Sequence, residues 1–260
     1  AGTAQARRHL AALQPSAVVG FGGYASFPPL AAARLMGRAR PAIILHEQNA
    51  VLGRANRLMA RAADRLALSF EGTSNVPAGA TPAVVGNPVR PEIAAVTPPE
   101  RRFAAREGRA RLLVFGGSQG AARLNAVVPA AIAELPEALR PEVLHQTGRG
   151  GHEDTVSAYQ SRGIEADVRP FIDDMASAYG WADLAVCRSG ALTVAELAAA
   201  GVPSVLVPFP AAVDDHQTRN AEHVVRGGGA VLLPESQLTP LSLAATLREL
   251  LEAGRPRLVR

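Results

Sequence analysis

Short apolar runs alternate along this chain with longer segments in which apolar residues recur at helical spacing. The runs predict strands, over Ala17–Gly20, Ala42–Leu45, Arg65–Ser69, Leu112–Phe115, Val143–Gln146, Leu184–Val186, Val205–Val207 and Val231–Leu233. The segments between them predict helices, over Leu30–Met36, Arg54–Ala62, Ala121–Glu134, Met175–Trp181, Thr193–Ala200 and Arg219–Arg226. Because continuous apolar strands suit a sheet that is covered on both faces, the pattern predicts an α/β fold with parallel sheets.

A proline-rich and charged segment interrupts this alternation. Its prolines are Pro88, Pro91, Pro98 and Pro99, and charged residues crowd the stretch from Glu100 to Arg111. Such a segment is typical of a linker. We therefore predict a first lobe over residues 1–90, a linker over 91–110 and a second lobe over 111–260. In open parallel sheets, ligands bind where the strands end, so the strand–helix turns are the candidate sites.

Composition narrows the function classes. The chain has 260 residues, of which 48% are hydrophobic but only 4% aromatic, so its core must consist mainly of Ala, Val and Leu. All 27 basic residues are arginine, the net charge is only +4, and no basic stripe stands out, which argues against nucleic acid as a partner. The single cysteine, Cys187, excludes an internal disulfide and is interpreted as a core residue.

Targeting and metal-binding patterns are missing from the sequence. No apolar run approaches the roughly 18 residues of a membrane span, and no signal peptide is visible. Neither a His-Glu-x-x-His motif nor a cysteine cluster occurs, so we expect no metal site. The sequence begins without Met in what reads as the middle of a helix, so we expect it to be a fragment.

The most informative turn is Ser189–Glu196, which follows the predicted strand Leu184–Val186 and opens the next helix. A helix N-terminus offers N–H groups and a positive dipole to an anion such as a diphosphate. Glu196 is poorly placed to help a phosphate, but it can accept hydrogen bonds from the hydroxyls of a ribose. The turn therefore indicates a nucleotide site, with a carboxylate that merely complements the helix dipole as the alternative.

Two glycine-rich turns follow predicted strands in the same way. Gly116–Gly120 would let backbone amides approach a phosphate, with Ser118 as a hydroxyl donor, although an ordinary strand–helix turn fits the pattern equally well. Gly20–Ser26 repeats the arrangement in the first lobe, and Pro28 and Pro29 suit the start of the helix behind it. A tight turn without a ligand is the alternative there.

Polar side chains also follow the predicted strand Ala42–Leu45. His46, Glu47, Gln48 and Asn49 can hydrogen-bond sugar hydroxyls. Alternatively, they form a polar loop in which Asn49 caps the next helix.

Further candidates lie near the lobe junction and in the second lobe. Arg90 can pair with a diphosphate or be an ordinary surface arginine. Asp173 is predicted to cap the helix Met175–Trp181, and the backbone at Ile172 can border a base. Gln217 lies just before another predicted helix, and its position alone assigns it no role.

Six motifs, in this order, resemble the MurG family, the bacterial N-acetylglucosaminyltransferases of glycosyltransferase family 28. They are Gly-Phe-Gly-Gly-Tyr at 20–24, His-Glu-Gln-Asn at 46–49, Gly-Asn-Pro-Val-Arg at 86–90, Gly-Gly-Ser-Gln-Gly at 116–120, Phe-Ile-Asp-Asp-Met at 171–175 and Cys-Arg-Ser-Gly-Ala-Leu-Thr-Val-Ala-Glu at 187–196. The resemblance spans nearly the whole chain. It implies a GT-B fold of two Rossmann-like lobes, of which the first is incomplete here.

The resemblance implies an inverting transfer of N-acetylglucosamine (GlcNAc) from UDP-GlcNAc to the C4 hydroxyl of the muramyl sugar in lipid I, which is undecaprenyl-pyrophosphoryl-MurNAc-pentapeptide. The products would be lipid II, for peptidoglycan synthesis and hence cell shape and division, and UDP. It also implies no obligate cofactor and a peripheral place on the cytoplasmic side of the bacterial inner membrane. Other cell-wall synthesis proteins are expected partners.

Carried over by matching position, the resemblance assigns substrate-binding roles in both lobes. The first lobe would hold the acceptor, and the second lobe, without its final helix, would hold the donor. The assigned residues are Asn49 and Gln217 at the GlcNAc, Arg90 at the donor from the hinge, Ser118 at the diphosphate or ribose side of the donor, Ile172 at the uracil through its backbone, Ala191, Leu192 and Thr193 at the diphosphate turn, Val194 and Ala195 beside them, and Glu196 at the ribose.

Two features of the family have no counterpart in this sequence. One is the Gly-Gly-Thr-Gly-Gly-His loop, whose histidine is usually proposed as part of the catalytic centre, and the other is the last C-terminal helical segment. The catalytic base is therefore unassigned, and we expect residues 1–260 alone to have little or no transferase activity. The alternatives are another GT-B UDP-sugar transferase, a UDP-sugar epimerase of the same fold, against which the motifs at 46–49 and 116–120 argue, and a fragment that binds UDP-sugar without catalysis.

Overall fold

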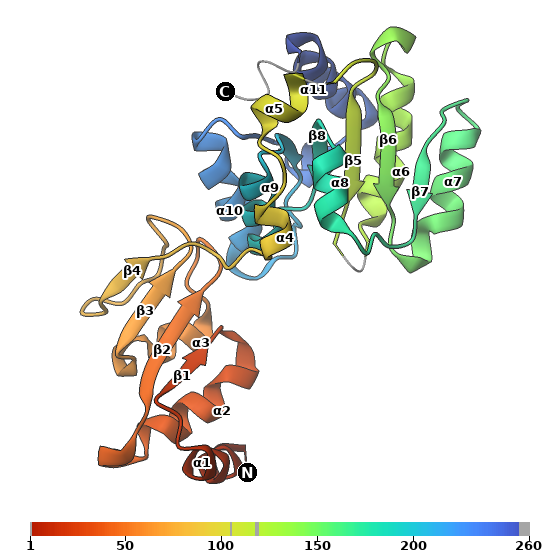
Figure 1. Ribbon diagram of the computed structural model, residues 1–260. Helices are drawn as coiled ribbons and strands as arrows, with labels where there is room; N and C mark the ends of the chain where they lie inside the picture. The colour runs from red at the N-terminus through yellow and green to blue at the C-terminus, as the bar shows by residue number, and fades with distance from the viewer. Residues whose placement is uncertain (1, 105, 118–119, 255–260) are drawn as a thin grey trace. The chain divides into compact units, whose positions relative to one another are not determined.

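A computed structural model describes residues 2–104, 106–117 and 120–254 (Figure 1). The chain divides into two compact units, Ala1–Pro88 and Val89–Arg260. Every strand pairing within the two sheets is parallel. The predicted α/β fold with parallel sheets is therefore confirmed.

The first unit is built on a four-stranded sheet in the order β1-β2-β3-β4. Its strands are β1 (Ala17–Gly20), β2 (Ala42–Glu47), β3 (Arg65–Leu68) and β4 (Pro82–Val84). Its helices are α1 (Gly2–Leu13), α2 (Gly23–Arg34) and α3 (Arg54–Met59), with short 3-10 turns at Gly37–Ala39 and Ala60–Ala62. The apolar positions of the strands and helices meet in one core, which includes Leu30, Ile43, Leu45 and Leu66.

Helix α2 differs from its prediction. It begins at Gly23, so Pro28 and Pro29 lie inside the helix rather than at its start. A proline within a helix has no N–H for the carbonyl four residues before it. Here those carbonyls belong to Tyr24 and Ala25, which are exposed and can be hydrated instead. The prolines therefore remain compatible with a helix that starts a turn and a half earlier.

The second unit is built on a six-stranded sheet in the order β10-β9-β8-β5-β6-β7. Its strands are β5 (Arg111–Phe115), β6 (Glu142–Gln146), β7 (Asp167–Arg169), β8 (Leu184–Cys187), β9 (Ser204–Leu206) and β10 (Ala230–Leu232). Its helices are α4 (Pro91–Ala94), α5 (Pro99–Ala104), α6 (Ala122–Ala133), α7 (His152–Gln160), α8 (Met175–Trp181), α9 (Ala191–Ala200), α10 (His216–Arg226) and α11 (Pro240–Ala253). Short 3-10 turns lie at Glu137–Leu139, Arg149–Gly151, Val213–Asp215 and Glu235–Gln237.

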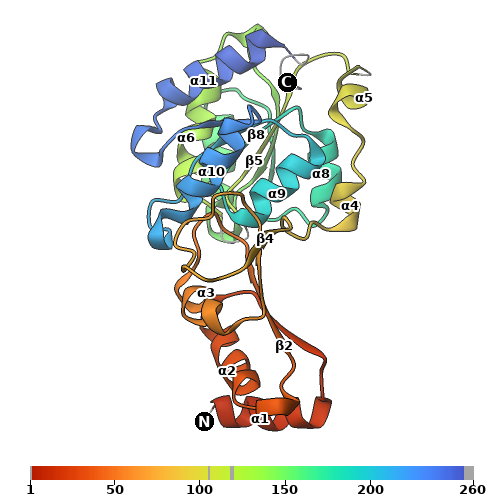
Figure 2. The ribbon, with the colours of Figure 1, turned by 90° about the vertical axis from the view of Figure 1, so that its left-hand side faces the viewer.

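Helices cover both faces of this sheet. In Figure 2, α6 and α11 lie on one side of β5 and β8, and α8 and α9 lie on the other. The core between the sheet and α6, α7 and α11 includes Leu112, Val114, Leu124, Val128 and Leu247. Cys187 is fully buried at the end of β8, and burial raises the pKa of its thiol. It is thus a core residue, as its position in the sequence predicts.

The sheet contains a point at which the strand order reverses. From β5 the chain proceeds to β6 and β7 on one side, and it then returns to β8 on the other side of β5. The loops after β5 and β8 therefore diverge, and they leave a crevice between them at the carboxyl ends of these strands. Ligands of open α/β sheets bind at such a point.

All eight predicted strands are present, with bounds that differ by at most two residues. The described residues also form two strands that the apolar pattern did not indicate, β4 (Pro82–Val84) and β7 (Asp167–Arg169). Each lies at the edge of its sheet. Edge strands are half solvated, so charges in β7 and a proline in β4 are tolerated and the apolar signal is lost.

Helix α5 lies in the stretch that was predicted as a linker, and it fixes the far end of α9. Arg102 of α5 is buried and donates hydrogen bonds to the carbonyls of Thr97 (2.7 Å), Ala200 (2.9 Å) and Gly201 (3.0 Å). The last two carbonyls end α9, where the helix dipole favours a cation. Arg102 therefore holds α9, the helix that follows the candidate nucleotide turn.

Candidate functional site

A cleft of about 620 Å³ lies at the reversal point of the second sheet. The segments after β5, β8, β9 and β10 form its walls. Its lining residues are Phe115, Gly116, Gly117, Gly120, Ala121, Ala122, Arg123, Arg188, Gly190, Thr193, Phe209, Gln217 and Glu235. The structure thus brings together the glycine turn at residues 116–120, the start of α9 at Ala191 and Gln217, which are distant from one another in the sequence.

The glycine turn after β5 is shaped by close backbone contacts. Gly117 and Gly120 have positive φ angles of 89° and 75°, and the Gly120 N–H donates to the Gly117 carbonyl at 3.0 Å. A Cβ at Gly120 would lie 2.0 Å from the carbonyl oxygen of Thr147. Only glycine fits here, because any side chain would collide with the backbone after β6. Ser118 lies outside the described residues.

Helix α9 points its N-terminus at the same cleft. It begins at Ala191 after the N-cap Gly190, and both Gly190 and Thr193 line the cleft. The N-cap Gly190 makes no side-chain cap hydrogen bond, and the dipole at this end of the helix favours an anion. Ala191 and Val194 are buried, and the Val194 N–H donates to the Gly190 carbonyl at 3.0 Å.

Glu196 lies one turn into α9 and is already bonded on both oxygens. Arg90 donates to Oε1 from Nε (3.3 Å) and from a terminal nitrogen (3.1 Å), and the Tyr179 hydroxyl donates to Oε2 at 3.0 Å. The Glu196 side chain is 15% exposed, whereas that of Arg90 is 49% exposed. Burial, with the Glu196 charge beside it, raises the pKa of Tyr179, so its hydroxyl stays a donor. Arg90 and Tyr179 thus orient Glu196.

Three charged residues that line the cleft, Arg123, Arg188 and Glu235, were not singled out from the sequence. Arg188 forms an ion pair with Glu235, donates to the carbonyls of Val207 (3.2 Å) and Pro208 (3.1 Å), and lies 5.4 Å from the ring centre of Phe209. These contacts hold the loop after β9. Gln217 joins the same loop, because its Oε1 accepts from the Phe209 N–H at 2.9 Å.

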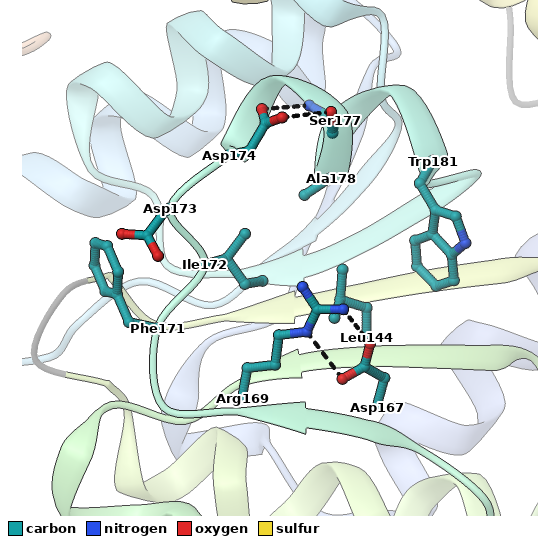
Figure 3. Close-up of a pocket in the computed structure, with 10 residues that line it drawn as sticks. All are labelled: Leu144, Asp167, Arg169, Phe171, Ile172, Asp173, Asp174, Ser177, Ala178 and Trp181. Carbon is teal, nitrogen blue, oxygen red and sulfur yellow. Dashed lines mark hydrogen bonds and ion pairs between the residues drawn. The ribbon is translucent and has the colours of Figure 1, made fainter.

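A second pocket, of about 520 Å³, lies between β7 and α8 (Figure 3). Ile172 forms part of its wall, and the Ile172 N–H donates to Oε1 of Gln146 at 2.8 Å. The helix cap here is Asp174, not Asp173 as predicted. The Asp174 carboxylate accepts a hydrogen bond from the N–H of Ser177 at 2.9 Å, and an N-cap side chain bonds the N–H three residues after it in this way. The hydrogen bond from the Ser177 hydroxyl lowers the pKa of the Asp174 carboxyl.

In the first unit, Glu47 organises the polar loop after β2. Its buried carboxylate accepts from the N–H groups of Asn49 (3.0 Å) and Gly53 (2.9 Å) and from the side chain of Asn56 (2.9 Å). Helix α3 begins after Gly53, so the interpretation of Asn49 as its cap is wrong. The carboxylate of Glu47 thus holds the loop at Asn49 and again at Gly53, the residue directly before α3. Asn49 itself also bonds Oε1 of Glu47 through its side chain, at 3.2 Å.

A buried polar network supports the end of β6. His145 is fully buried between α6 and α7, with Nδ1 2.9 Å from the Tyr159 hydroxyl and Nε2 3.2 Å from Oδ1 of Asn125. Asn125 in turn donates to the Thr147 carbonyl at 2.9 Å. These partners suit a neutral imidazole that accepts at Nδ1 and donates at Nε2. Burial lowers the pKa of His145 to about 3.

This histidine gives the protein an acid sensitivity. Below pH 6.5 the unfolded chain binds a proton at His145 and the folded chain does not. The free energy of unfolding should therefore fall between pH 6.5 and about 3, with a contribution of up to about 1.4 kcal/mol per pH unit from this residue. Urea unfolding of His145→Asn should show a shallower decline, whereas His9→Asn, at an exposed position, should not change it. Equal slopes for all three proteins would contradict a buried neutral His145.

Sequence and structure comparisons identify the class of protein that this fold and cleft define. Residues 111–256 match the glycosyltransferase family 28 C-terminal domain, and residues 1–68 match the corresponding N-terminal domain. The chain belongs to glycosyltransferase family 28. It is 55% identical over 250 residues to a protein of Chromohalobacter salexigens and 48% identical over 246 residues to one of Marinobacter nauticus.

Both relatives are named UDP-N-acetylglucosamine–N-acetylmuramyl-(pentapeptide) pyrophosphoryl-undecaprenol N-acetylglucosamine transferase. Each alignment covers 95% of this chain, which spans about two thirds of the length of these relatives, 67% and 66%. The crystal structure of MurG from Acinetobacter baumannii superposes with a TM-score of 0.85 at 37% identity, over 99% of this chain and 71% of that one. A UDP-N-acetylglucosamine 2-epimerase from Listeria monocytogenes, at 13% identity and a TM-score of 0.66, shares the fold.

Proposed function

We propose that the second unit binds UDP-GlcNAc in the cleft at the reversal point, and that the enzyme transfers the GlcNAc to the muramyl C4 hydroxyl of lipid I. The reaction inverts the anomeric centre and releases UDP. The observation that carries this proposal is the cleft itself, in which the glycine turn after β5, the start of α9 and Gln217 converge in a family 28 chain. The proposal names no obligate cofactor.

The diphosphate would lie between the glycine turn and the start of α9. The backbone N–H groups and the helix dipole there would stabilise the negative charge that develops on the leaving UDP. Ala191, Leu192, Thr193, Val194 and Ala195 would border the diphosphate through the first turns of the helix, together with Ser118. Arg90 is half exposed, so it can turn from Glu196 toward an incoming diphosphate while Tyr179 keeps its own bond to Glu196.

The sugars and the base would occupy the neighbouring positions. Glu196 would accept hydrogen bonds from the ribose hydroxyls, and Gln217 would contact the GlcNAc. The N–H of Ile172 is taken up by Gln146, so its carbonyl oxygen is the group left for the base. Asn49 is proposed as a further GlcNAc contact on the family resemblance alone.

The acceptor side of the proposal rests on the first unit and on the family. We propose that the first unit holds lipid I at the cytoplasmic face of the inner membrane, as a peripheral protein. The names of the two relatives include a pyrophosphoryl-undecaprenol acceptor, which is anchored in a membrane. Among the described residues, no helix is both long and apolar enough to cross a bilayer.

Calorimetry tests the donor assignment. UDP-GlcNAc should bind the chain more tightly than UDP-glucose does, because only the former offers an N-acetyl group to the cleft. Equal affinities for the two sugars would contradict the assignment of the donor. Binding of neither sugar nucleotide, by a chain shown to be folded by circular dichroism, would contradict the nucleotide site as a whole.

Replacing Glu196 with alanine should weaken UDP-GlcNAc binding by about 1–3 kcal/mol, because charged hydrogen bonds to the ribose are lost. Calorimetry on the folded variant measures this loss. Glu222→Ala is the matched control, since Glu222 forms an exposed ion pair with Arg219 on α10 and does not line the cleft. Unchanged affinity in Glu196→Ala would contradict the assignment of Glu196 to the ribose and leave it only its bonds to Arg90 and Tyr179.

A further inference from the structure

Gln146 ends strand β6 and lies between the two loops that the proposed function assigns to the two ends of the nucleotide. Its side chain is 3% exposed. Nε2 donates to the Gly117 carbonyl at 3.1 Å, and Oε1 accepts from the Ile172 N–H at 2.8 Å. Both functional atoms of one carboxamide are thus used, each by a different loop.

The two loops belong to different strands. Gly117 lies in the glycine turn after β5 and lines the cleft, whereas Ile172 lies in the connection from β7 to α8 and lines the pocket of Figure 3. Strand β6 pairs with β5 on one side and with β7 on the other. Gln146 therefore sits where one side chain can reach both loops from the strand between them.

The residue after Gln146 supports the same turn. The Thr147 carbonyl occupies the space that a Cβ of Gly120 would need, and the Thr147 N–H donates to the Arg169 carbonyl at 3.0 Å. The end of β6 thus holds the glycine turn at two points, at Gly117 through a side chain and at Gly120 through the backbone. On the other side, Thr147 bonds Arg169 at the end of β7, and Gln146 bonds Ile172 in the loop that follows.

We propose that Gln146 is a positioning residue that sets the spacing between the diphosphate turn and the base loop. A nucleoside diphosphate must satisfy both loops at once, and a fixed spacing removes the ordering cost that binding would otherwise carry. This inference rests on the proposed function, since it deepens the account of the same nucleotide site. In this proposal Gln146 does not contact the anomeric carbon or the hydroxyl that attacks it, and it acts only through the two loops that it bonds.

Three variants separate this role from a general loss of stability. Gln146→Met removes both hydrogen bonds at similar volume. Gln146→Glu keeps an acceptor for the Ile172 N–H but loses the donor to Gly117. Thr155→Val is the matched control, because Thr155 is equally buried in the same unit and its hydroxyl bonds only the Gly151 carbonyl within its own helix start.

The test is calorimetry with UDP on the 260-residue chain, combined with hydrogen exchange of the peptides that contain 116–120 and 170–174. UDP affinity should fall about tenfold or more in Gln146→Met and in Gln146→Glu, where a carboxylate oxygen would face the Gly117 carbonyl, and it should stay within about twofold in Thr155→Val. In the parent, UDP should slow exchange in both peptides. In Gln146→Met, UDP at saturation should protect only one of them.

Two results would overturn the inference while leaving the proposed function intact. One is an unchanged UDP affinity in Gln146→Met, and the other is an equal loss in Gln146→Met and Thr155→Val at equal loss of unfolding free energy. If the folded parent does not bind UDP at all, the proposed function fails and the inference falls with it. The parent measurement therefore tells the two failures apart.

Discussion

Replacing Asp183 with alanine should lower the free energy of unfolding of the second unit by about 3–5 kcal/mol, because it leaves a buried arginine without its counter-charge. The carboxylate of Asp183 is fully buried at the start of β8. It pairs with Arg106, whose side chain is 9% exposed, and accepts from the Arg111 N–H at 3.0 Å. One side chain thus joins the start of β5, the start of β8 and the segment after α5.

Urea unfolding followed by circular dichroism measures this effect. Asp167→Ala is the control, since Asp167 pairs with Arg169 at an exposed edge strand and should change the free energy by less than about 1 kcal/mol. Asp183→Asn keeps one of the two acceptor oxygens and loses the charge. Its stability should lie between those of the parent and Asp183→Ala, so the series can still be read if Asp183→Ala fails to fold. Equal stability of Asp183→Ala and Asp167→Ala would contradict the assigned role.

Replacing Gly120 with alanine should nearly abolish nucleotide binding. The positive φ of 75° costs a non-glycine residue about 1–2 kcal/mol, and the new Cβ would meet the Thr147 oxygen at 2.0 Å. The Thr147 carbonyl is held in place, because it accepts a hydrogen bond from Asn125 and because the N–H of Thr147 donates to the Arg169 carbonyl. The turn must therefore move away, and a shift of about 1 Å at the diphosphate should reduce UDP affinity about a hundredfold.

Gly163→Ala is the matched control for backbone strain. Gly163 has a similar φ of 64°, and a Cβ added there would meet open space, with no described atom beyond its chain neighbours within 4 Å. The variant should lose about 1–2 kcal/mol of stability and no UDP affinity. Calorimetry that finds Gly120→Ala and Gly163→Ala equally competent would contradict a nucleotide site at the glycine turn.

The apolar pattern was sufficient to predict the sheets because buried parallel strands are continuous apolar runs. The pattern did not predict β4 and β7. These strands lie at sheet edges, where they are only partly buried, and they contain a proline and charged residues in place of a continuous apolar run. The pattern misplaces the start of helix α2, because paired prolines are typical of a helix start, whereas here the exposed residues before them leave the freed carbonyls open to water. Strand order, and hence the reversal point between β5 and β8, was not contained in the local pattern.

The candidate site was predicted in part for a similar reason. Turns such as Ser189–Glu196 are local, so strand–helix alternation locates them. The bonds that orient Glu196 come from Arg90, 106 residues earlier, and from Tyr179 of another helix. Gln146 did carry a local signal, because it is a polar residue at the end of an apolar strand, the same rule that singled out His46. Its two partners became visible only with the sheet order.

The central claim is that UDP-GlcNAc binds at the carboxyl ends of β5 and β8. The most direct measurement is a UDP-GlcNAc titration of the labelled chain, followed through its backbone amide resonances. We predict that the largest shifts occur at Gly116, Gly117 and Gly120 and from Gly190 to Glu196, with saturation at one equivalent. Shifts that cluster elsewhere, with these amides unmoved at saturation, would contradict the account.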